Sequence, residues 1–359
     1  MQPNLEAAEL IEQRSDEELD MTRLEPYLRE HLGGADGLLS VGQFHGGKAN
    51  LTYLLRFGER EFVLRRPPLG PIPPGAHDMR REHRVLSRLY RQFSLAPRSL
   101  LLCEDDSIIG AVFIVEERRH GFVIRDDIPP EFAGRPELNR RIGESLIDAL
   151  ADLHRVEPAA VGLGDLGRPD GFMERQLTGW TKRWYAAQGG EQAERSATMM
   201  APVLDWLAAN LPAGGGAALL HNDYRLDNCL LDTADPARFA AVLDWDMCTL
   251  GDPLADLGYI LNYWVEPGDD PAWREIASMP TWRDGFPSRA EAIQRYATRT
   301  GFDCDAVGWY QVFAAFKLAV IIQQIYIRFV RGQTQDERFR HYYRRVHGLA
   351  DKARLLAGI

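Results

Sequence analysis

The chain has 359 residues and a formal net charge of −10 at pH 7, from 42 Lys and Arg against 52 Asp and Glu. This length is sufficient to bury a large core and favours two lobes over one. The acidic balance argues against a general nucleic-acid binder, because such proteins carry a basic surface. We therefore expect no nucleic-acid partner.

From residue 1 to about residue 115, the sequence predicts a small antiparallel sheet with one long helix. Residues 1–20 are expected to form a helical or frayed acidic arm, and residues 21–32 a helix that ends at Gly33-Gly34. Alternating strand patterns follow, with a charged helix at about 78–93. The expected strands are 38–44, 51–57, 61–65, 99–103 and 111–116.

Helical patterns dominate from residue 136 onward. The clearest of them lie at 142–153, 176–187 and 199–210. Two short strands, at 219–221 and 240–244, bracket a segment rich in polar side chains. No internal repeat or low-complexity tract interrupts this order. The pattern as a whole predicts an α+β protein.

Cysteine usage and hydropathy predict a cytoplasmic protein with no membrane partner. The four cysteines lie far apart and form no C-x-x-C pair: Cys103, Cys229, Cys248 and Cys304. Neither a zinc site nor a disulfide framework is expected from that spacing, and reduced thiols fit a cytosol. Residues 1–20 lack the apolar core of a signal peptide. The most apolar region, 309–330, includes Lys317 and Arg328, which favours a buried helix over a membrane span.

The strongest chemical motif is the frame H-x-D-x-x-x-x-N from His221 to Asn228, followed sixteen residues later by Asp244. This is the layout of a phosphoryl-transfer site. Asp223 is the candidate catalytic base, because a carboxylate beside a hydroxyl can accept its proton. Asn228 and Asp244 are candidate Mg²⁺ ligands, since Mg²⁺ prefers oxygen and takes few protein groups. The structural alternatives are a solvated loop Asp, a turn Asn and a strand-end Asp.

Other polar residues around the motif are expected to support it. His221 is predicted to hold the loop by hydrogen bonding, and Asp256 to cap the following helix or brace the loop. Asp246 is either a second metal contact or a turn carboxylate. Asp227 and Arg225 lie either near substrate or on the surface.

The N-terminal part carries candidate nucleotide-binding residues. Gly46, Gly47, Lys48 and Asn50 lie between two strands, where glycines let backbone N–H groups approach phosphate oxygens, although paired glycines also mark ordinary hairpins. No Walker loop occurs. Strand alternation places Arg65 on the face of Val63, from which it is expected to reach phosphates and pair with Glu82. The alternatives are an edge-strand arginine and the neighbouring Arg66.

Together these residues resemble the aminoglycoside phosphotransferase and choline kinase-like family. The closer likeness is to phosphotransferases found alone in bacteria or fused to acyl-CoA dehydrogenase domains in animals. The resemblance rests on Gly46-Gly47, residues 62–68, Leu153-His154, residues 161–163 and 180–184, His221-Asn222-Asp223, residues 243–246 and Gly251-Asp252-Pro253. It covers about residues 25 to 265. The motifs near the end of this range, from His221 onward, are the ones specific to the family.

The resemblance implies a protein-kinase-like, two-lobed fold. Its lobes are expected at residues 1–115, which bind nucleotide, and at 122–359, which hold the catalytic loop and acceptor site, with a hinge at 116–121. It implies that Asp223 is the catalytic base and that Asn228 and Asp244 bind Mg²⁺. It also implies that residues 46–50 cover the triphosphate. The purine is expected against a hinge segment formed by Val115, Glu116, Glu117 and Arg118. The wider family carries Lys where this chain has Arg65, whose head is wider and planar.

The implied activity is an ATP- and Mg²⁺-dependent small-molecule kinase that transfers the γ-phosphoryl group to a substrate hydroxyl. The acyl-CoA dehydrogenase association favours a hydroxy acid or a hydroxyacyl thioester as acceptor. An antibiotic phosphotransferase acting on aminoglycosides or macrolides is one alternative. A catalytically inactive, kinase-like nucleotide-binding module is another, although the intact set Asp223, Asn228 and Asp244 argues against it. A protein kinase is disfavoured, because the segment from Asp244 to Asp256 is too short for an activation loop. The sequence specifies no oligomeric state.

Overall fold

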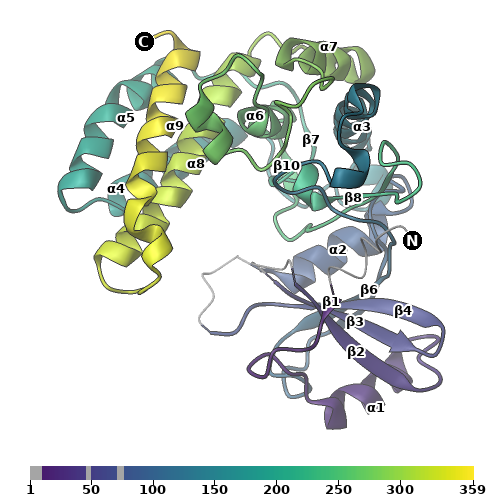
Figure 1. Ribbon diagram of the computed structural model, residues 1–359. Helices are drawn as coiled ribbons and strands as arrows, with labels where there is room; N and C mark the ends of the chain where they lie inside the picture. Colours follow the sequence, from purple (N-terminus) through teal and green to yellow (C-terminus); the bar gives the residue numbers. More distant parts are fainter. Residues whose placement is uncertain (1–9, 46–49, 71–76) are drawn as a thin grey trace. The chain divides into compact units, whose positions relative to one another are not determined.

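The computed structural model describes residues 10–45, 50–70 and 77–359. They form two compact units, which Figure 1 shows coloured along the chain. The first contains the described residues up to Val123, together with Glu157–Gly164 and Asn228–Cys248. The second contains Ile124–Val156, Asp165–Asp227 and Thr249–Ile359. Each unit is therefore assembled from segments that are distant in the sequence.

The first unit is built on an antiparallel sheet. Within the described residues its strand order is β1-β2-β3-β4-β6-β5. The strands are β1 (Leu10–Ile11), β2 (Leu39–Phe44), β3 (Leu51–Phe57), β4 (Arg60–Arg66), β5 (Ser99–Cys103) and β6 (Phe113–Glu117). Because strand side chains alternate, Phe62 and Leu64 on β4 enter the core while Arg65 points to the opposite face.

One helix covers each face of this sheet (Figure 1). Helix α1 (Met21–His31) begins at Asp20, which accepts a hydrogen bond from the Thr22 amide, and its Leu24 and Leu28 join the core with Phe62 and Leu64. Helix α2 (Met79–Leu89) begins at Asp78 and packs against β5 and β6. Buried Glu82 on α2 lies on the Arg65 side of the sheet.

A small hairpin also belongs to the first unit. Strands β8 (Cys229–Leu231) and β9 (Phe239–Val242) are antiparallel, with Cys229 opposite Val242. The ladder continues one step further, because the Leu243 amide donates to the Asn228 carbonyl at 2.8 Å. Asn228 and Asp244 are thereby held at the same end of the hairpin.

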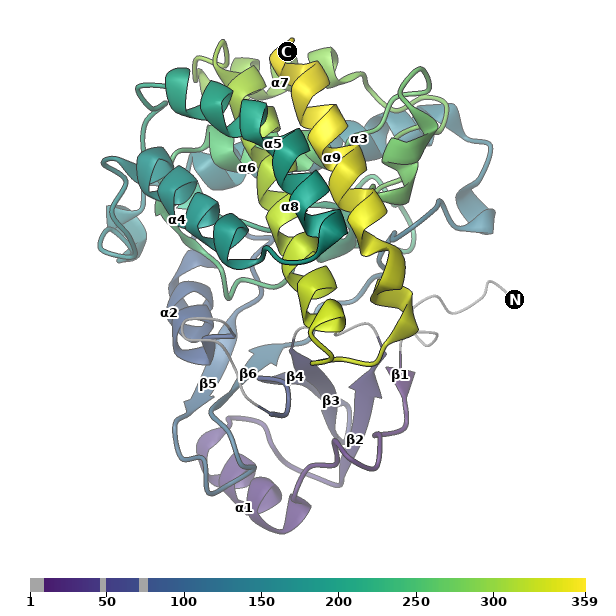
Figure 2. The same ribbon diagram turned by 90° about the vertical axis from the view of Figure 1, so that its left-hand side faces the viewer.

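The second unit is mainly helical. Its helices are α3 (Pro136–His154), α4 (Phe172–Ala186), α5 (Glu191–Ala209), α6 (Leu254–Tyr263), α7 (Arg289–Thr300), α8 (Val307–Val330) and α9 (Tyr342–Ala357). Short 3₁₀ helices occur at Pro130–Phe132, Pro271–Glu275 and Glu337–His341, and in the first unit at Ala159–Val161. A further 3₁₀ turn, Leu226–Asn228, begins in the second unit and ends in the first. Figure 2 shows α5, α8 and α9 lying side by side.

Helix α8 is the central helix of the second unit. It is long and apolar enough by composition to cross a membrane, but 67% of its most apolar window is buried inside the protein. It packs closely on α6 at Gly258, where an added Cβ would lie 2.5 Å from Tyr310 Cβ. This close approach requires glycine at position 258.

A second two-stranded sheet precedes the motif from His221 to Asn228. Strand β7 (Ala218–Leu220) pairs antiparallel with β10 (Thr249–Gly251), with Leu220 opposite Thr249. His221 follows β7 directly, and α6 begins three residues after β10. Because the strands are antiparallel, the motif continues from the Thr249 end of this sheet and α6 from the end formed by Ala218 and Gly251.

The structure confirms the α+β prediction: an antiparallel sheet near the N-terminus and a mainly helical remainder. Residues 1–20 were expected to be helical or frayed, and the helical alternative is wrong for residues 10–20, where Leu10–Ile11 is a strand because its backbone pairs with Phe44 and Gln43 at the edge of β2. Strands β8 and β10 were not predicted, since each has only three residues and too short an alternation to detect. Helix α5 begins at Glu191, eight residues before the predicted start.

Candidate active site

Arg65 stands among three carboxylates in the first unit. Its Nη2 lies 2.6 Å from Asp244 Oδ1 and 3.1 Å from Glu82 Oε1, and its Nε lies 3.9 Å from Glu116 Oε1. The predicted Arg65–Glu82 pair is therefore present. Strand alternation separates Arg65 from Arg66, which is buried on the other face and donates to the Ile109 carbonyl at 2.7 Å.

Asp246 and Asn50 extend this cluster. The Asn50 amide nitrogen lies 3.5 Å from Asp244 Oδ1 and 3.5 Å from Asp246 Oδ2. His77 Nδ1 lies 2.9 Å from Asn50 Oδ1 and 3.6 Å from Asp246 Oδ2. Asp246, which the sequence left open, thus faces the cluster and not a surface turn. His77 was not predicted, and no motif in the sequence marks it.

The cluster holds more negative charge than Arg65 can neutralise. Burial raises the pKa of Glu82 to about 8, with Arg65 opposing the shift and neighbouring carboxylates adding to it. Burial likewise raises the pKa of Glu116 to about 7 and moves the pKa of Asp246 upward, reinforced in both by the Asp244 charge. Glu82 Oε2 and Glu116 Oε1 are buried without a hydrogen-bond partner among the described residues.

This donor set fits Mg²⁺. A divalent cation would offset the excess charge, and carboxylate and amide oxygens are its preferred ligands. No three His, Cys, Asp or Glu among the described residues converge closely enough to hold a metal by themselves. Few protein ligands are typical of a Mg²⁺ that also binds substrate phosphates.

Asp244 has an unusual backbone conformation. Its φ is +70°, in the left-handed region that Asp and Asn tolerate better than most side chains. The next residue, Trp245, donates its backbone N–H to Glu82 Oε1 at 3.2 Å and buries its ring completely. These contacts hold the turn that presents the Asp244 carboxylate to Arg65.

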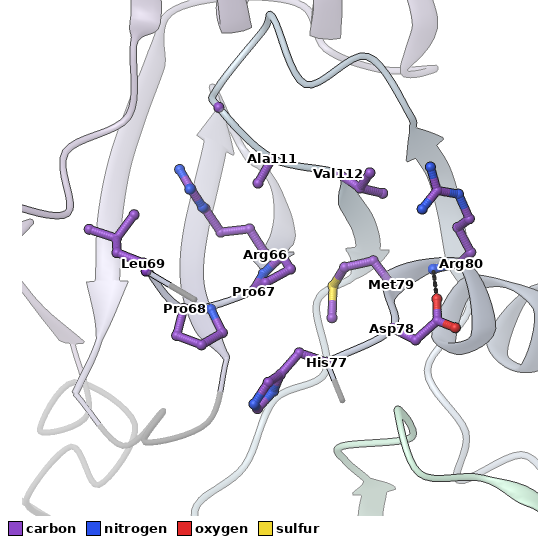
Figure 3. Close-up of a pocket in the computed structure, with 12 residues that line it drawn as sticks. Arg66, Pro67, Pro68, Leu69, His77, Asp78, Met79, Arg80, Ala111 and Val112 are labelled. Atoms are coloured by element: carbon purple, nitrogen blue, oxygen red, sulfur yellow. Dashed lines mark hydrogen bonds between the residues drawn. The ribbon is translucent and has the colours of Figure 1, made fainter. Parts of the chain in front are cut away.

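A cavity of about 490 Å³ borders the cluster within the first unit. Figure 3 shows side chains from the end of β4, the start of α2 and residues 110–112 around it. His77 both lines this cavity and contacts Asp246. The cavity and the charged cluster therefore share His77.

In the second unit, Asp256 holds the loop that follows β7. Its carboxylate accepts the backbone N–H groups of His221 at 2.6 Å and Asn222 at 2.9 Å. His154 Nε2 lies 3.3 Å from the same carboxylate, and His154 Nδ1 lies 2.6 Å from the Tyr296 hydroxyl. Burial opposes ionisation of Asp256, but His154 and His221 together lower its pKa. The contacts agree with the predicted supporting roles of His221 and Asp256.

Asp223 is held by side chains from α6 and from its own loop. The Tyr259 hydroxyl donates to Asp223 Oδ1 at 2.8 Å, and Arg225 Nε lies 3.4 Å from the same oxygen. Burial raises the pKa of Tyr259 well above 10, and the Asp223 charge adds to the shift, so this tyrosine remains a donor. The Asp223 amide donates to His221 Nδ1 at 3.3 Å. The arrangement orients a carboxylate that can accept a proton.

Arg225 links Asp223 to Asp227. Its Nε lies 3.0 Å from Asp227 Oδ1, and its guanidinium lies 5.5 Å from the centre of the Tyr263 ring. Burial raises the pKa of Asp227 to about 6, although Arg225 opposes the shift. Asp227 is therefore a partner of Arg225 and not a free surface residue.

Tyr259 and Tyr263 were not predicted to belong to the site, although their spacing from Asp256 in the sequence marks them. They follow Asp256 at three and seven residues on α6, which places all three on one helix face. Lys317, a lysine within the most apolar helix of the chain, was not predicted either. That charge had served only as an argument against a membrane span.

The other predicted nucleotide-binding residues differ in their contacts. Gly46, Gly47 and Lys48 lie outside the described residues. Glu116 turns toward Arg65, whereas Glu117 accepts the Arg98 amide at 2.9 Å. The Arg118 guanidinium lies 4.9 Å from the centre of the Phe44 ring. Contact of residues 116–118 with a purine stays a prediction.

Comparison with known proteins connects this geometry to a family. Residues 40–298 match the model of the phosphotransferase enzyme family. Mouse acyl-CoA dehydrogenase family member 10 is 33% identical over 315 residues, which are 87% of this chain and 29% of that protein. The chain thus spans less than a third of that relative's length.

Solved structures share the fold. A Ralstonia eutropha protein described as a candidate aminoglycoside phosphotransferase has a TM-score of 0.80 and 31% identity, covering 95% of this chain and 99% of its own. A thermostable aminoglycoside phosphotransferase APH(4)-Ia, bound to AMP-PNP and hygromycin B, has a TM-score of 0.58 and 17% identity, covering 91% and 98%. The fold is therefore the protein-kinase-like, two-lobed one that was predicted.

The matched segment includes the motif from His221 to Asn228, Asp244, and the Arg65–Glu82 pair. The predicted family, enzyme class and fold are all confirmed by these comparisons. The chain belongs to the phosphotransferase enzyme family and is a phosphotransferase with a hydroxyl group as acceptor.

Proposed function

We propose that this protein is an ATP- and Mg²⁺-dependent small-molecule kinase that transfers the γ-phosphoryl group to the hydroxyl of a hydroxy acid or hydroxyacyl thioester. The observation that carries the proposal is the charge arrangement around Arg65. Four carboxylates share this one guanidinium, and the pKa of Glu82 is raised to about 8. Buried carboxyl groups whose ionised forms are this unfavourable suit a cation-bound nucleotide, because a cation stabilises the ionised forms.

The residues divide into two sets by their chemistry. Asn228 and Asp244, at one end of the β8–β9 hairpin, would hold Mg²⁺, which neutralises developing charge on the phosphates when bound. Arg65 would contact the phosphates, because its planar head offers several N–H donors. Asp223 would accept the hydroxyl proton, with Tyr259 fixing the carboxylate orientation.

The two sets are close neighbours along the chain. Asp223 and Asn228 are five residues apart in the sequence and belong to the same motif. Phosphoryl transfer needs little covalent chemistry from the protein and depends mainly on positioning and charge. The proposed roles require only those two contributions.

The acceptor class is suggested by the relatives. The matched mouse protein is named as an acyl-CoA dehydrogenase family member, and a hydroxylated acyl group is the kind of acceptor that would accompany acyl chemistry. All four cysteines are free and buried, which fits the proposed cytoplasmic location. An antibiotic acceptor is the second candidate, because a structure with the same fold binds hygromycin B.

Two measurements test the proposal. Calorimetric titration with ATP should show binding that depends on Mg²⁺, and an ADP-release assay should show slow turnover in water that hydroxy acids, hydroxyacyl thioesters or antibiotics increase. Acceleration by antibiotics alone would replace the proposed acceptor class. A chain that binds no Mg-ATP and releases no ADP would instead be an inactive kinase-like module.

A further inference from the structure

Lys317 places a positive charge beside the catalytic loop of the second unit. It lies on α8, where almost all neighbouring residues are apolar. Its Nζ is 3.3 Å from the Asn222 carbonyl oxygen and 4.6 Å from the centre of the Tyr259 ring. A lysine in such a helix costs solvation free energy, so its ammonium group calls for a function or a partner.

The neighbouring carboxylates are not in direct contact with Lys317. Among the described residues its ammonium has one protein hydrogen bond, to the Asn222 carbonyl, although the group has three N–H donors. Burial lowers the pKa of Lys317, while Asp223 and Asp256 oppose the shift and Arg183 adds to it. The ammonium therefore retains donor capacity for another acceptor.

Arg183 adds a second cation at the same place. The Arg183 guanidinium lies 4.6 Å from the centre of the Trp180 ring, and Lys317 Nζ lies 5.6 Å from that centre. Both attractions to the ring are favourable, but the two like charges repel each other. A bound anion would relieve that repulsion, and the indole would supply an apolar surface beside it.

A small cavity opens beside Lys317. Its volume is about 20 Å³, enough for one oxygen-sized atom. Its polar lining is Lys317, Gln176, Asn222, Tyr259 and Asp256, whose carboxylate oxygens already accept the His221 and Asn222 amides, and its apolar lining includes Phe172, Met173 and Phe313. An oxygen of a carboxylate can enter this space while an attached hydrocarbon chain meets the apolar wall.

Tyr259 connects this cavity to the catalytic carboxylate. Its hydroxyl donates to Asp223 Oδ1, and its ring is the surface on which Lys317 rests. The span of one tyrosine side chain is comparable to a short hydroxy acid. Such an acid can therefore present its hydroxyl to Asp223 and its carboxylate to Lys317.

We propose that Lys317, with Arg183 beside it on Trp180, recognises a carboxylate of the acceptor and makes the enzyme select hydroxy acids over neutral or cationic alcohols. This inference rests on the proposed kinase function. It favours a free acid within the proposed acceptor class and disfavours polycationic aminoglycosides, because two cations at the acceptor pocket repel them.

The test uses three four-carbon alcohols that differ in charge: 3-hydroxybutyrate, 3-hydroxybutanamide and 4-amino-2-butanol. Their dissociation constants are measured by NMR titration of the full chain, and any phosphorylation by ADP release. The acid should bind about tenfold more tightly than the amide, and the amine most weakly, as expected for one charge-assisted contact. Lys317→Met should abolish this order, Arg183→Gln should weaken it, and Lys317→Arg should restore part of it.

Lys352→Met is the matched control. Lys352 is also a buried lysine that donates to a backbone carbonyl, that of Asn262, and its Nζ lies 4.5 Å from the Trp273 ring centre. Its removal should leave the order of affinities unchanged. Arg183 is exposed, so Arg183→Gln tests the site even if Lys317→Met fails to fold.

Three outcomes would each overturn the inference. They are equal binding of the three alcohols, no binding of 3-hydroxybutyrate, and an unchanged order of affinities in a folded Lys317→Met protein. The kinase proposal is tested separately by Mg-ATP binding. Acid binding without Mg-ATP binding would leave the anion site standing and remove the kinase function. Mg-ATP turnover without selection among the three alcohols by charge would support the kinase function and remove the anion site.

Discussion

The carboxylates of the two units have opposite electrostatic surroundings. In the first unit, Glu82, Glu116, Asp244 and Asp246 compete for Arg65, and the pKa values of three of them are raised. In the second unit, Asp223 has the Tyr259 hydroxyl at 2.8 Å and Arg225 at 3.4 Å. The first arrangement has more carboxylates than its one guanidinium can pair with, whereas in the second the carboxylate is oriented by a tyrosine and an arginine. In the proposed mechanism, the carboxylates of the first unit attract a metal-bound ligand and that of Asp223 accepts a proton.

The largest expected effect comes from removing the oriented base. Asp223→Ala should lower kcat for a confirmed acceptor by about 10²–10⁴-fold, because proton transfer by a positioned group contributes that much. Melting temperature should stay close to that of the wild type. Steady-state ADP release at saturating Mg-ATP measures the change, with the exposed Asp205→Ala on α5 as control. Wild-type kcat in Asp223→Ala would remove Asp223 from the proposed mechanism.

The next largest effect is expected in the carboxylate cluster around Arg65. Asp244→Asn keeps a side chain that tolerates φ of +70° but removes a charged ligand. At Mg-ATP concentrations about 100-fold above Kd, the wild type should gain about 2.7 kcal/mol of stability. The variant should gain little. Thermal melts with and without Mg-ATP provide the measurement, and equal stabilisation of both proteins would show that Asp244 binds no metal.

A smaller effect is expected from the hydrogen bond to Asp223. Tyr259→Phe removes the donor while keeping the ring beneath Lys317, and kcat should fall by about tenfold, the equivalent of one hydrogen bond. Tyr263→Phe is the control, because its hydroxyl is 3.2 Å from that of Tyr259 and is not bonded to Asp223. A similar loss in both variants would contradict a specific role for Tyr259.

The smallest predicted effect is a pH dependence of stability. The pKa values of Glu82 and Glu116, about 8 and 7, exceed the ordinary value of 4.5, so the folded protein binds these protons more tightly than the unfolded chain. Their stabilising contribution is complete below about pH 4.5 and is lost as pH rises through 7 and 8. Without Mg-ATP, stability should therefore fall progressively from about pH 4.5 to pH 8.

Glu82→Gln separates this dependence from other titrations. The variant has no proton to lose at position 82, so its melting temperature should vary less between pH 5 and 8 than that of the wild type. Mg-ATP should reduce the wild-type dependence in the same way, because a cation stabilises the ionised carboxylates. An identical pH profile in both proteins would show that Glu82 is already ionised at pH 5.

Local patterns were sufficient to predict the parts of the site that depend on short stretches of chain. Alternation along β4 distinguished Arg65 from Arg66, and the spacing from His221 to Asn228 identified the catalytic loop. His77 was not predictable, because it meets Asp246 from 169 residues away in the sequence. Lys317 was overlooked for another reason: a charge in an apolar helix has no local partner, and its neighbours come from α4, α6 and the loop after β7.

The attachment of Asp256 to two backbone amides has a consequence for redesign of the enzyme. Because the carboxylate accepts backbone N–H groups, its hold on position 222 does not depend on the side chain there, whereas the buried His221 ring is needed to accept the Asp223 amide. Position 222 is limited mainly by its φ of +66°, which glycine also satisfies. A library that varies position 222 while conserving His221 and Asp256 should therefore yield folded variants with altered acceptor preference, whereas variation at 256 should mostly yield misfolded loops.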